Sequence, residues 1–169
     1  HISLFCMQTE NDAERMATLT GRAASVHVTG NVKFDILPPP LTPEKAATLS
    51  AEIGLPVGAP CVVFGSTHAT EEVLALRLLN ELRSAGRNEV IIICPRHPER
   101  FDDVAELIGE HRLPTGQAPA WVRASQLPKL PAAAAPDVIL LDRMGVLARA
   151  FGLGQVAIVG GSFVAVGGH

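Results

Sequence analysis

From residue 60 onward, short apolar runs alternate with segments in which apolar residues recur every three or four positions. The first pattern predicts buried strands, and the second predicts amphipathic helices. Strands that are apolar throughout and alternate with helices are typical of a parallel sheet covered on both faces, so we expect an α/β fold. The predicted strands are 61–64, 90–94, 120–123, 138–141 and 156–159, and the predicted helices are 70–84, 98–111 and 145–151. A loop rich in proline and alanine is predicted over 127–136.

The opening segment of the chain has a different pattern. Two short strands, 3–7 and 26–29, flank a helix over 12–19 that ends at Gly21. Three consecutive prolines from Pro38 predict an extended connector after them. A helix that begins at Thr42 or Pro43 follows and ends at Gly54. We therefore expect an interdomain or opening segment over 1–36 and a main domain over 37–169. The chain starts without methionine and stops in a glycine-rich loop, which predicts a fragment truncated at its carboxyl terminus.

Composition excludes several classes of function. Hydrophobic residues make up 47% of the chain, charged residues make up 18%, and the net charge is -3. This acidic balance argues against nucleic-acid binding. The longest apolar run, 156–168, is too short and too rich in glycine to span a bilayer. The three cysteines are odd in number and lie in apolar runs, which predicts reduced thiols.

Two kinds of catalytic site also find no support in the sequence. The six histidines are scattered, with no spacing typical of metal ligands, and no GxSxG elbow is present. We therefore expect neither a metal site nor a hydrolytic triad.

Polar residues and glycines follow the four clearest strands, where ligands of open α/β sheets bind. Gly65, Ser66 and Thr67 precede the start of a predicted helix, whose first amides favour an anion. An ordinary turn with a helix cap is the alternative interpretation. Arg96 has the forked donor geometry that suits phosphate or carboxylate, and His97 offers a second donor or a stacking surface. The other strand ends carry Asp142, Met144 and Gly145, then Gly160, Gly161 and Ser162, with Gly168 and His169 following. Asp142 could bind a hydroxyl group, but it is expected to cap the helix that follows.

Taken together, these motifs resemble the carboxyl-terminal half of the transferases of 3-deoxy-D-manno-octulosonic acid (Kdo). The matching stretches occur in the family's order along nearly the whole chain. They are Gln8-Thr9-Glu10, Val28 to Asp35, Gly65-Ser66-Thr67-His68 with Glu71-Glu72, Pro95 to Phe101, Met144-Gly145, and Val159 to Phe163 closing on Gly167-Gly168-His169.

The resemblance implies the carboxyl-terminal, donor-binding half of a GT-B glycosyltransferase, in which two Rossmann-like domains face each other across a cleft. The implied donor is CMP-Kdo, and the implied acceptor is a lipid A precursor at the cytoplasmic face of the inner membrane. The implied catalytic base belongs to the amino-terminal half, so the fragment is expected to be inactive. The fragment is also expected to be soluble. No cofactor or metal is implied.

The resemblance also assigns roles to residues at the strand ends. Gly65, Ser66 and Thr67 would face the phosphate or the sugar carboxylate, and Arg96 with His97 would lie against CMP. Further donor-binding residues would be Met144 and Gly145 at the cytosine, Gly160, Gly161 and Ser162 with amides toward the phosphate, and Gly168 and His169.

Two alternative functions remain open on the sequence. Another GT-B enzyme with a different nucleotide sugar would keep the fold and the phosphate contacts. A nucleotide-binding α/β module without catalytic activity would keep only the fold.

Overall fold

A computed structural model describes residues 2–32, 40–127 and 135–164 of the chain. The chain divides into two units, His1–Pro39 and Pro40–His169, and each is described by itself. Most of the predicted proline connector and of the predicted loop over 127–136 lie outside the described residues, as do Gly168 and His169.

The first unit is a small βαβ arrangement. Strands β1 (Phe5–Met7) and β2 (Val26–Val28) pair in parallel, and helix α1 (Glu10–Thr20) connects them with the short 3-10 helix η1 (Ala23–Ser25). The Thr9 side chain caps α1 by accepting a hydrogen bond from the Asp12 amide, and Gly21 ends the helix in the left-handed conformation. The sequence predicted both strands, the helix and its glycine end.

The second unit is built on a five-stranded parallel sheet with strand order β5-β6-β4-β3-β7. This confirms the predicted α/β fold. The strands are β3 (Cys61–Thr67), β4 (Val90–Pro95), β5 (Trp121–Arg123), β6 (Val138–Leu140) and β7 (Val156–Val159).

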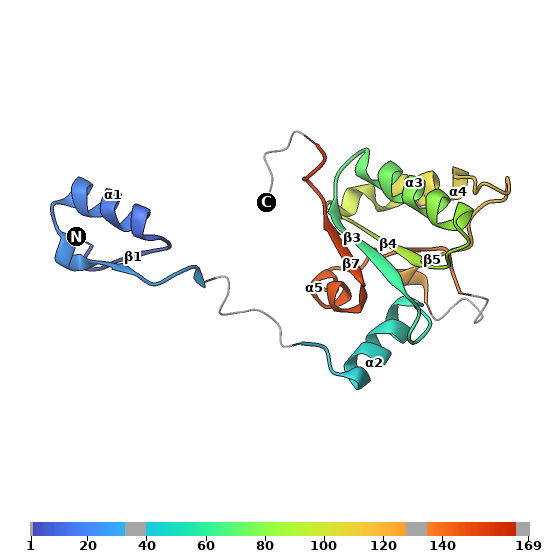
Figure 1. Cartoon of the computed structure of the whole chain (residues 1–169), viewed down its shortest axis with the longest axis horizontal. Coiled ribbons are helices and arrows are strands. Elements are labelled where there is room, and N and C mark those ends of the chain that lie inside the picture. Colours follow the sequence, from blue (N-terminus) through green and yellow to red (C-terminus); the bar gives the residue numbers. More distant parts are fainter. Residues whose placement is uncertain (1, 33–39, 128–134, 165–169) are drawn as a thin grey trace. The chain divides into compact units, whose positions relative to one another are not determined.

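Helices cover both faces of this sheet (Figure 1). Successive side chains of a strand point to opposite faces, so Val63 and Ile92 join one apolar core while Val62 and Ile91 join the other. Helices α2 (Pro43–Ile53) and α5 (Leu147–Ala150) pack on the first face, and α3 (Glu71–Ser84) and α4 (Phe101–Glu110) pack on the second. Three 3-10 turns complete the unit, η3 (Pro98–Arg100), η4 (Ala124–Gln126) and η5 (Phe151–Leu153).

Strand β3 is longer than its apolar run. It continues through Gly65 to Thr67, which pairs with Pro95 after a register shift at Ser66. The predicted turn is therefore the bulged end of a strand, and α3 begins only at Glu71. Bulges of this kind occur beside functional sites, where they re-aim side chains.

Strand β7 lies at one edge of the described sheet and is more exposed than its apolar sequence predicts. Val156 is 51% exposed and Val159 is 45% exposed. An edge strand has a neighbour on one side only, so its apolar side chains lack the packing that buries β4 completely. Within the described parts of the chain, no helix has the length and apolar character needed to cross a membrane.

Candidate functional site

The carboxyl ends of β4, β3 and β7 lie next to one another at one edge of the sheet, because neighbouring parallel strands end at the same edge. Ser66, Arg96 and Gly160 sit at these three ends. The turn with Met144 and Gly145 follows β6, the neighbour of β4 on its other side. The structure thus brings the described candidate residues to one edge.

One group of these residues faces outward. Arg96 is exposed, and its guanidinium has no hydrogen bond or ion pair with any residue that the structure describes. The side chain of His97 is 51% exposed, and its Nδ1 lies 3.7 Å from a Glu99 carboxylate oxygen. Its ring meets the His68 ring edge-on at 5.8 Å, which links the ends of β4 and β3. Met144 is 76% exposed. Arginine and histidine in this setting are available to an anionic or planar ligand.

Ser66 has an unusual backbone conformation. Its φ of 56° lies in the left-handed region, which few non-glycine residues adopt. Burial raises the pKa of the nearby Cys94 thiol to about 11. The conformation places Ser66 out of the regular ladder at the strand end. Backbone strain of this kind clusters at ligand sites, where the surrounding structure maintains it.

Two glycines of the predicted site, Gly65 and Gly160, are explained by packing of the protein against itself. A Cβ at Gly65 would lie 2.7 Å from Leu147 and still closer to the Phe151 ring. A Cβ at Gly160 would overlap the Ser66 carbonyl oxygen and lie 2.7 Å from the Thr67 Cα. Close approach to a ligand is therefore not needed to explain either glycine.

Two buried carboxylates lie behind this edge, in the first turn of α3. Glu72 is fully buried; it accepts hydrogen bonds from the Thr67 hydroxyl at 2.7 Å and from two guanidinium nitrogens of Arg100 at 2.6 and 3.2 Å. Glu71 is 2% exposed and accepts three backbone amides. These are the His68 amide at 2.8 Å, the Gly161 amide at 2.9 and 3.0 Å to its two oxygens, and the Phe163 amide at 3.1 Å.

These bonds keep Glu71 ionised. Burial alone would raise its pKa, but the backbone amides of His68, Gly161 and Phe163 outweigh burial, so the pKa lies below its ordinary value of 4.5. The negative charge also sits at the positive end of the α3 dipole, which favours it.

The internal bonds correct several sequence-based expectations. Gly161 was expected to give its amide to a phosphate, yet that amide donates to Glu71, and the Gly160 amide donates to the Gly65 carbonyl at 2.8 Å. Thr67 is only 1% exposed, and its hydroxyl donates a hydrogen bond to the Glu72 carboxylate. The Ser162 hydroxyl donates to the Val159 carbonyl at 2.9 Å. The protein itself occupies these donors, whereas Arg96, His97 and Met144 are exposed and Ser66 is half-buried.

The start of α3 is also not an open anion site. Its first turn carries the carboxylates of Glu71 and Glu72, so negative charge from the protein already lies at this helix end. Asp142 likewise has a structural role: its carboxylate accepts the amide and the hydroxyl of Ser125 and pairs with Arg123. It thus joins the ends of β6 and β5. The prediction that Asp142 caps the helix that follows is wrong, because its carboxylate is bonded to Ser125 and Arg123.

Sequence reasoning gave Glu71 and Glu72 no structural role. A usable pattern was present, because Glu72 lies on the same helical stripe as the buried Ala75, Leu76 and Leu79. A charged residue on a buried stripe needs a partner inside the protein.

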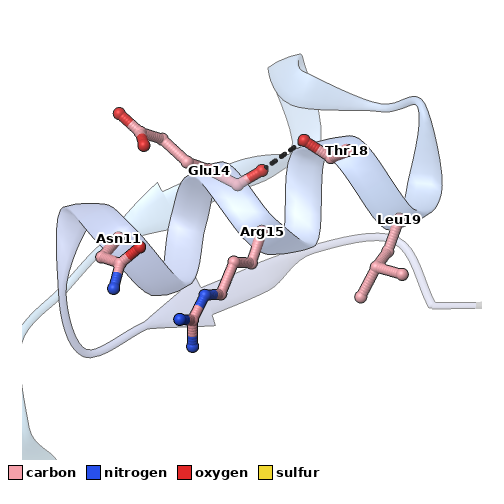
Figure 2. Close-up of a pocket in the computed structure, with 5 residues that line it drawn as sticks. All are labelled: Asn11, Glu14, Arg15, Thr18 and Leu19. Atoms are coloured by element: carbon pink, nitrogen blue, oxygen red, sulfur yellow. Dashed lines mark hydrogen bonds between the residues drawn. The ribbon is translucent and has the colours of Figure 1, made fainter.

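The first unit carries a separate shallow depression on one side of α1 (Figure 2). Its lining residues are Asn11, Glu14, Arg15, Thr18 and Leu19. Figure 2 shows the Thr18 hydroxyl bonded to the Glu14 carbonyl, a contact within the helix, at 2.9 Å. None of the predicted donor-binding residues lines this depression. Among the described residues, no group of His, Cys, Asp and Glu side chains is arranged to hold a metal ion.

Comparison with known proteins matches the chain to Kdo transferases at several levels. A family described as 3-deoxy-D-manno-octulosonic-acid transferase (kdotransferase) matches residues 1–36. The 3-deoxy-D-manno-octulosonic acid transferase of Haemophilus influenzae is 32% identical over 99% of this chain and 37% of its own length. A bifunctional glycosyltransferase/methyltransferase of Fusobacterium nucleatum is 33% identical over 99% of this chain and 24% of its own length.

The crystal structure of the C-terminal CMP-Kdo binding domain of WaaA from Acinetobacter baumannii also matches. It is 35% identical with a TM-score of 0.51, and the match covers 72% of this chain and 58% of that chain. The sheet and its helices thus define an α/β domain with the fold of that binding domain. The chain is a homologue of the Kdo transferases, as the resemblance predicted. It spans only 24% and 37% of the length of the Fusobacterium and Haemophilus relatives, respectively.

Proposed function

We propose that this chain contains the donor-binding domain of a glycosyltransferase and that its ligand is CMP-Kdo. The observation that carries the proposal is the match in fold and sequence to the CMP-Kdo binding domain of WaaA. Its second unit has the same kind of sheet, with the candidate residues at the edge where α/β sheets bind ligands.

The chemistry of the outward-facing residues supports this proposal. CMP-Kdo carries a phosphate and a carboxylate, and the exposed Arg96 guanidinium offers a forked set of donors to such groups. His97 and the Ser66 hydroxyl lie at neighbouring strand ends, and Met144 offers an apolar surface to a base. The other residues that the resemblance assigns to the site remain part of the proposal, although the structure already bonds the Thr67 and Ser162 hydroxyls and the Gly160 and Gly161 amides within the protein. They are Gly65, Thr67, Gly145, Gly160, Gly161, Ser162, Gly168 and His169.

For the whole protein, we propose transfer of Kdo from CMP-Kdo to a lipid A precursor at the cytoplasmic face of the inner membrane. Such a transfer needs a base on the acceptor hydroxyl and stabilisation of the leaving phosphate. The described strand-end residues suit only the second task. Residues 37–169 would then form the donor domain, residues 1–36 would be an opening segment, and the chain alone would not transfer Kdo.

Calorimetric titration with CMP, UMP and ADP tests the proposed ligand, first on this chain and then on Arg96→Ala. We expect preference for CMP and an affinity about tenfold or more lower in the variant, since a charge-assisted hydrogen bond contributes about 1.5–3 kcal/mol. Arg77→Ala is the matched control, because Arg77 is exposed on α3 and also has no charged partner among the described residues.

Two outcomes would contradict the proposal. Equal binding of the three nucleotides would exclude a cytosine-selective site, and equal losses in the Arg96 and Arg77 variants would exclude a specific contact of Arg96. Kdo transfer by this chain without further residues would contradict its assignment as a binding domain alone.

A further inference from the structure

The Glu71 carboxylate connects two loops that are far apart in the sequence. It accepts the amide of His68 from the loop after β3, and the amides of Gly161 and Phe163 from the loop after β7. The Gly161 amide lies within 3.0 Å of both carboxylate oxygens. One buried side chain at the start of α3 thus fixes the main chain of both loops.

The two loops also pack directly on each other. The Gly160 backbone lies so close to the Ser66 carbonyl that a Cβ would not fit, and the Gly160 amide bonds to the Gly65 carbonyl at 2.8 Å. Any displacement of the β7 loop therefore changes the surroundings of Ser66. Ser66 is a half-buried candidate residue of the site, and its left-handed φ needs support from the surrounding structure.

Glu72 differs from Glu71 in what it holds. Its partners are Thr67 at the end of β3 and Arg100 in η3, and none of its hydrogen bonds reaches the β7 loop. Glu71 is therefore the carboxylate of this pair that links β7 to β3.

We propose that Glu71 is a positioning residue of the donor site, whose carboxylate holds the loop after β7 against the end of β3 and thereby fixes Ser66 and the Gly160–Ser162 backbone for ligand binding. This inference rests on the proposed function, because the site that Glu71 shapes is the proposed CMP-Kdo site. It assigns Glu71 no contact with the ligand.

Glu71→Gln tests the role with almost no change in side-chain volume. The NH2 group of glutamine replaces one of the two carboxylate oxygens, so it faces either the His68 amide or the Phe163 amide as a second donor. The clamp is thereby broken at one of its two ends while the packing is kept. We expect hydrogen exchange at the His68 or the Phe163 amide to become at least about tenfold faster, with core amides such as Ile92 unchanged. CMP affinity, measured by calorimetry, is expected to fall about tenfold.

Two further variants make the test specific. Glu71→Asp keeps the charge and is expected to recover part of the CMP affinity and of the amide protection; it also serves as the test if Glu71→Gln does not fold. Glu81→Gln removes an exposed carboxylate from the same helix and is expected to change neither measurement.

Three results would overturn the inference. Wild-type exchange at both His68 and Phe163 in Glu71→Gln would show that no clamp exists, and unchanged CMP affinity would show that the clamp does not shape the site. If the unmodified chain bound no CMP, the proposed function and the positioning role would both fail. The exchange measurement, which needs no ligand, would then still separate a false clamp from a false ligand.

Discussion

Gly160 is the residue at which the strand ends of the candidate site come closest together. Its lack of a side chain lets the β7 backbone lie against the backbone of Ser66 and Thr67. Gly65 has the same function on the side of α5, where Leu147 and Phe151 fill the space. The close packing at these two glycines leaves no room for a side chain, so we expect small changes to them to lower stability.

Gly160→Ala is expected to lower the free energy of unfolding by about 1–3 kcal/mol, the usual cost of forcing extra atoms into a packed region. The neighbouring atoms are backbone and cannot rotate away. Urea denaturation measures the change. Gly109→Ala on α4 is the matched control, because no atom lies within 4 Å of its Cβ position, and it is expected to stabilise by about 0.5–1 kcal/mol. Equal effects of the two variants would contradict the packing argument.

At the scale of the elements, buried carboxylates join the strand ends at the edge that carries the candidate site. Glu71 joins β3 to β7, and Asp142 joins β6 to the turn after β5. Burial alone would raise the Asp142 pKa, but hydrogen bonds from Ser125 and Arg123 outweigh it and hold the pKa below its ordinary value of 3.8. A carboxylate with a lowered pKa in the folded state stabilises the fold in its ionised form.

The sign of this effect gives a pH prediction for Asp142→Asn. The contribution of Asp142 is complete above its ordinary pKa of 3.8 and is lost as pH falls through the lower pKa of the folded state. The variant should therefore be less stable by about 2 kcal/mol at pH 7, and the difference should shrink as pH falls below 3.8. Urea denaturation of both proteins at pH 7, 5 and 3 measures it. A difference that stays constant with pH would show that ionisation of Asp142 is not involved.

At the scale of the whole molecule, both apolar cores belong to the second unit. Their buried residues all lie between Leu49 and Ala150, and helix α1 of the first unit buries no residue. The division proposed from the sequence, with a donor domain after residue 36, therefore predicts that the second unit folds by itself.

A chain of residues 40–169 is expected to unfold in one cooperative transition, with a melting temperature within about 5 °C of that of the longer chain. It is also expected to keep the affinity of the longer chain for CMP. Circular dichroism and calorimetry measure the two properties. Loss of cooperative unfolding would show that the first unit is needed for the core.

The sequence predicted the fold better than the site, for a physical reason. Apolar strands such as 90–94 and helix ends such as Gly54 follow from local periodicity and backbone preference, and both appear as predicted. Outward placement of Arg96 follows from its position after a buried strand. The partner of the Gly161 amide cannot be predicted from the local sequence, because Glu71 lies 90 residues earlier in the chain. A local pattern cannot reveal a hydrogen bond that only tertiary structure creates.

The place of β7 in the sheet sets an entropic cost on the candidate site. Its ladder with β3 joins the most distant strand pair in the described sheet; beside it, the Cys61 amide and the Gln155 side chain are bonded across 94 residues. Closing a longer loop of chain costs more conformational entropy than closing a shorter one. Pairing of β7 with β3 therefore carries the largest loss of conformational entropy among the strand pairs of the described sheet. Each backbone amide that Glu71 binds in the loop after β7 offsets part of that entropic cost.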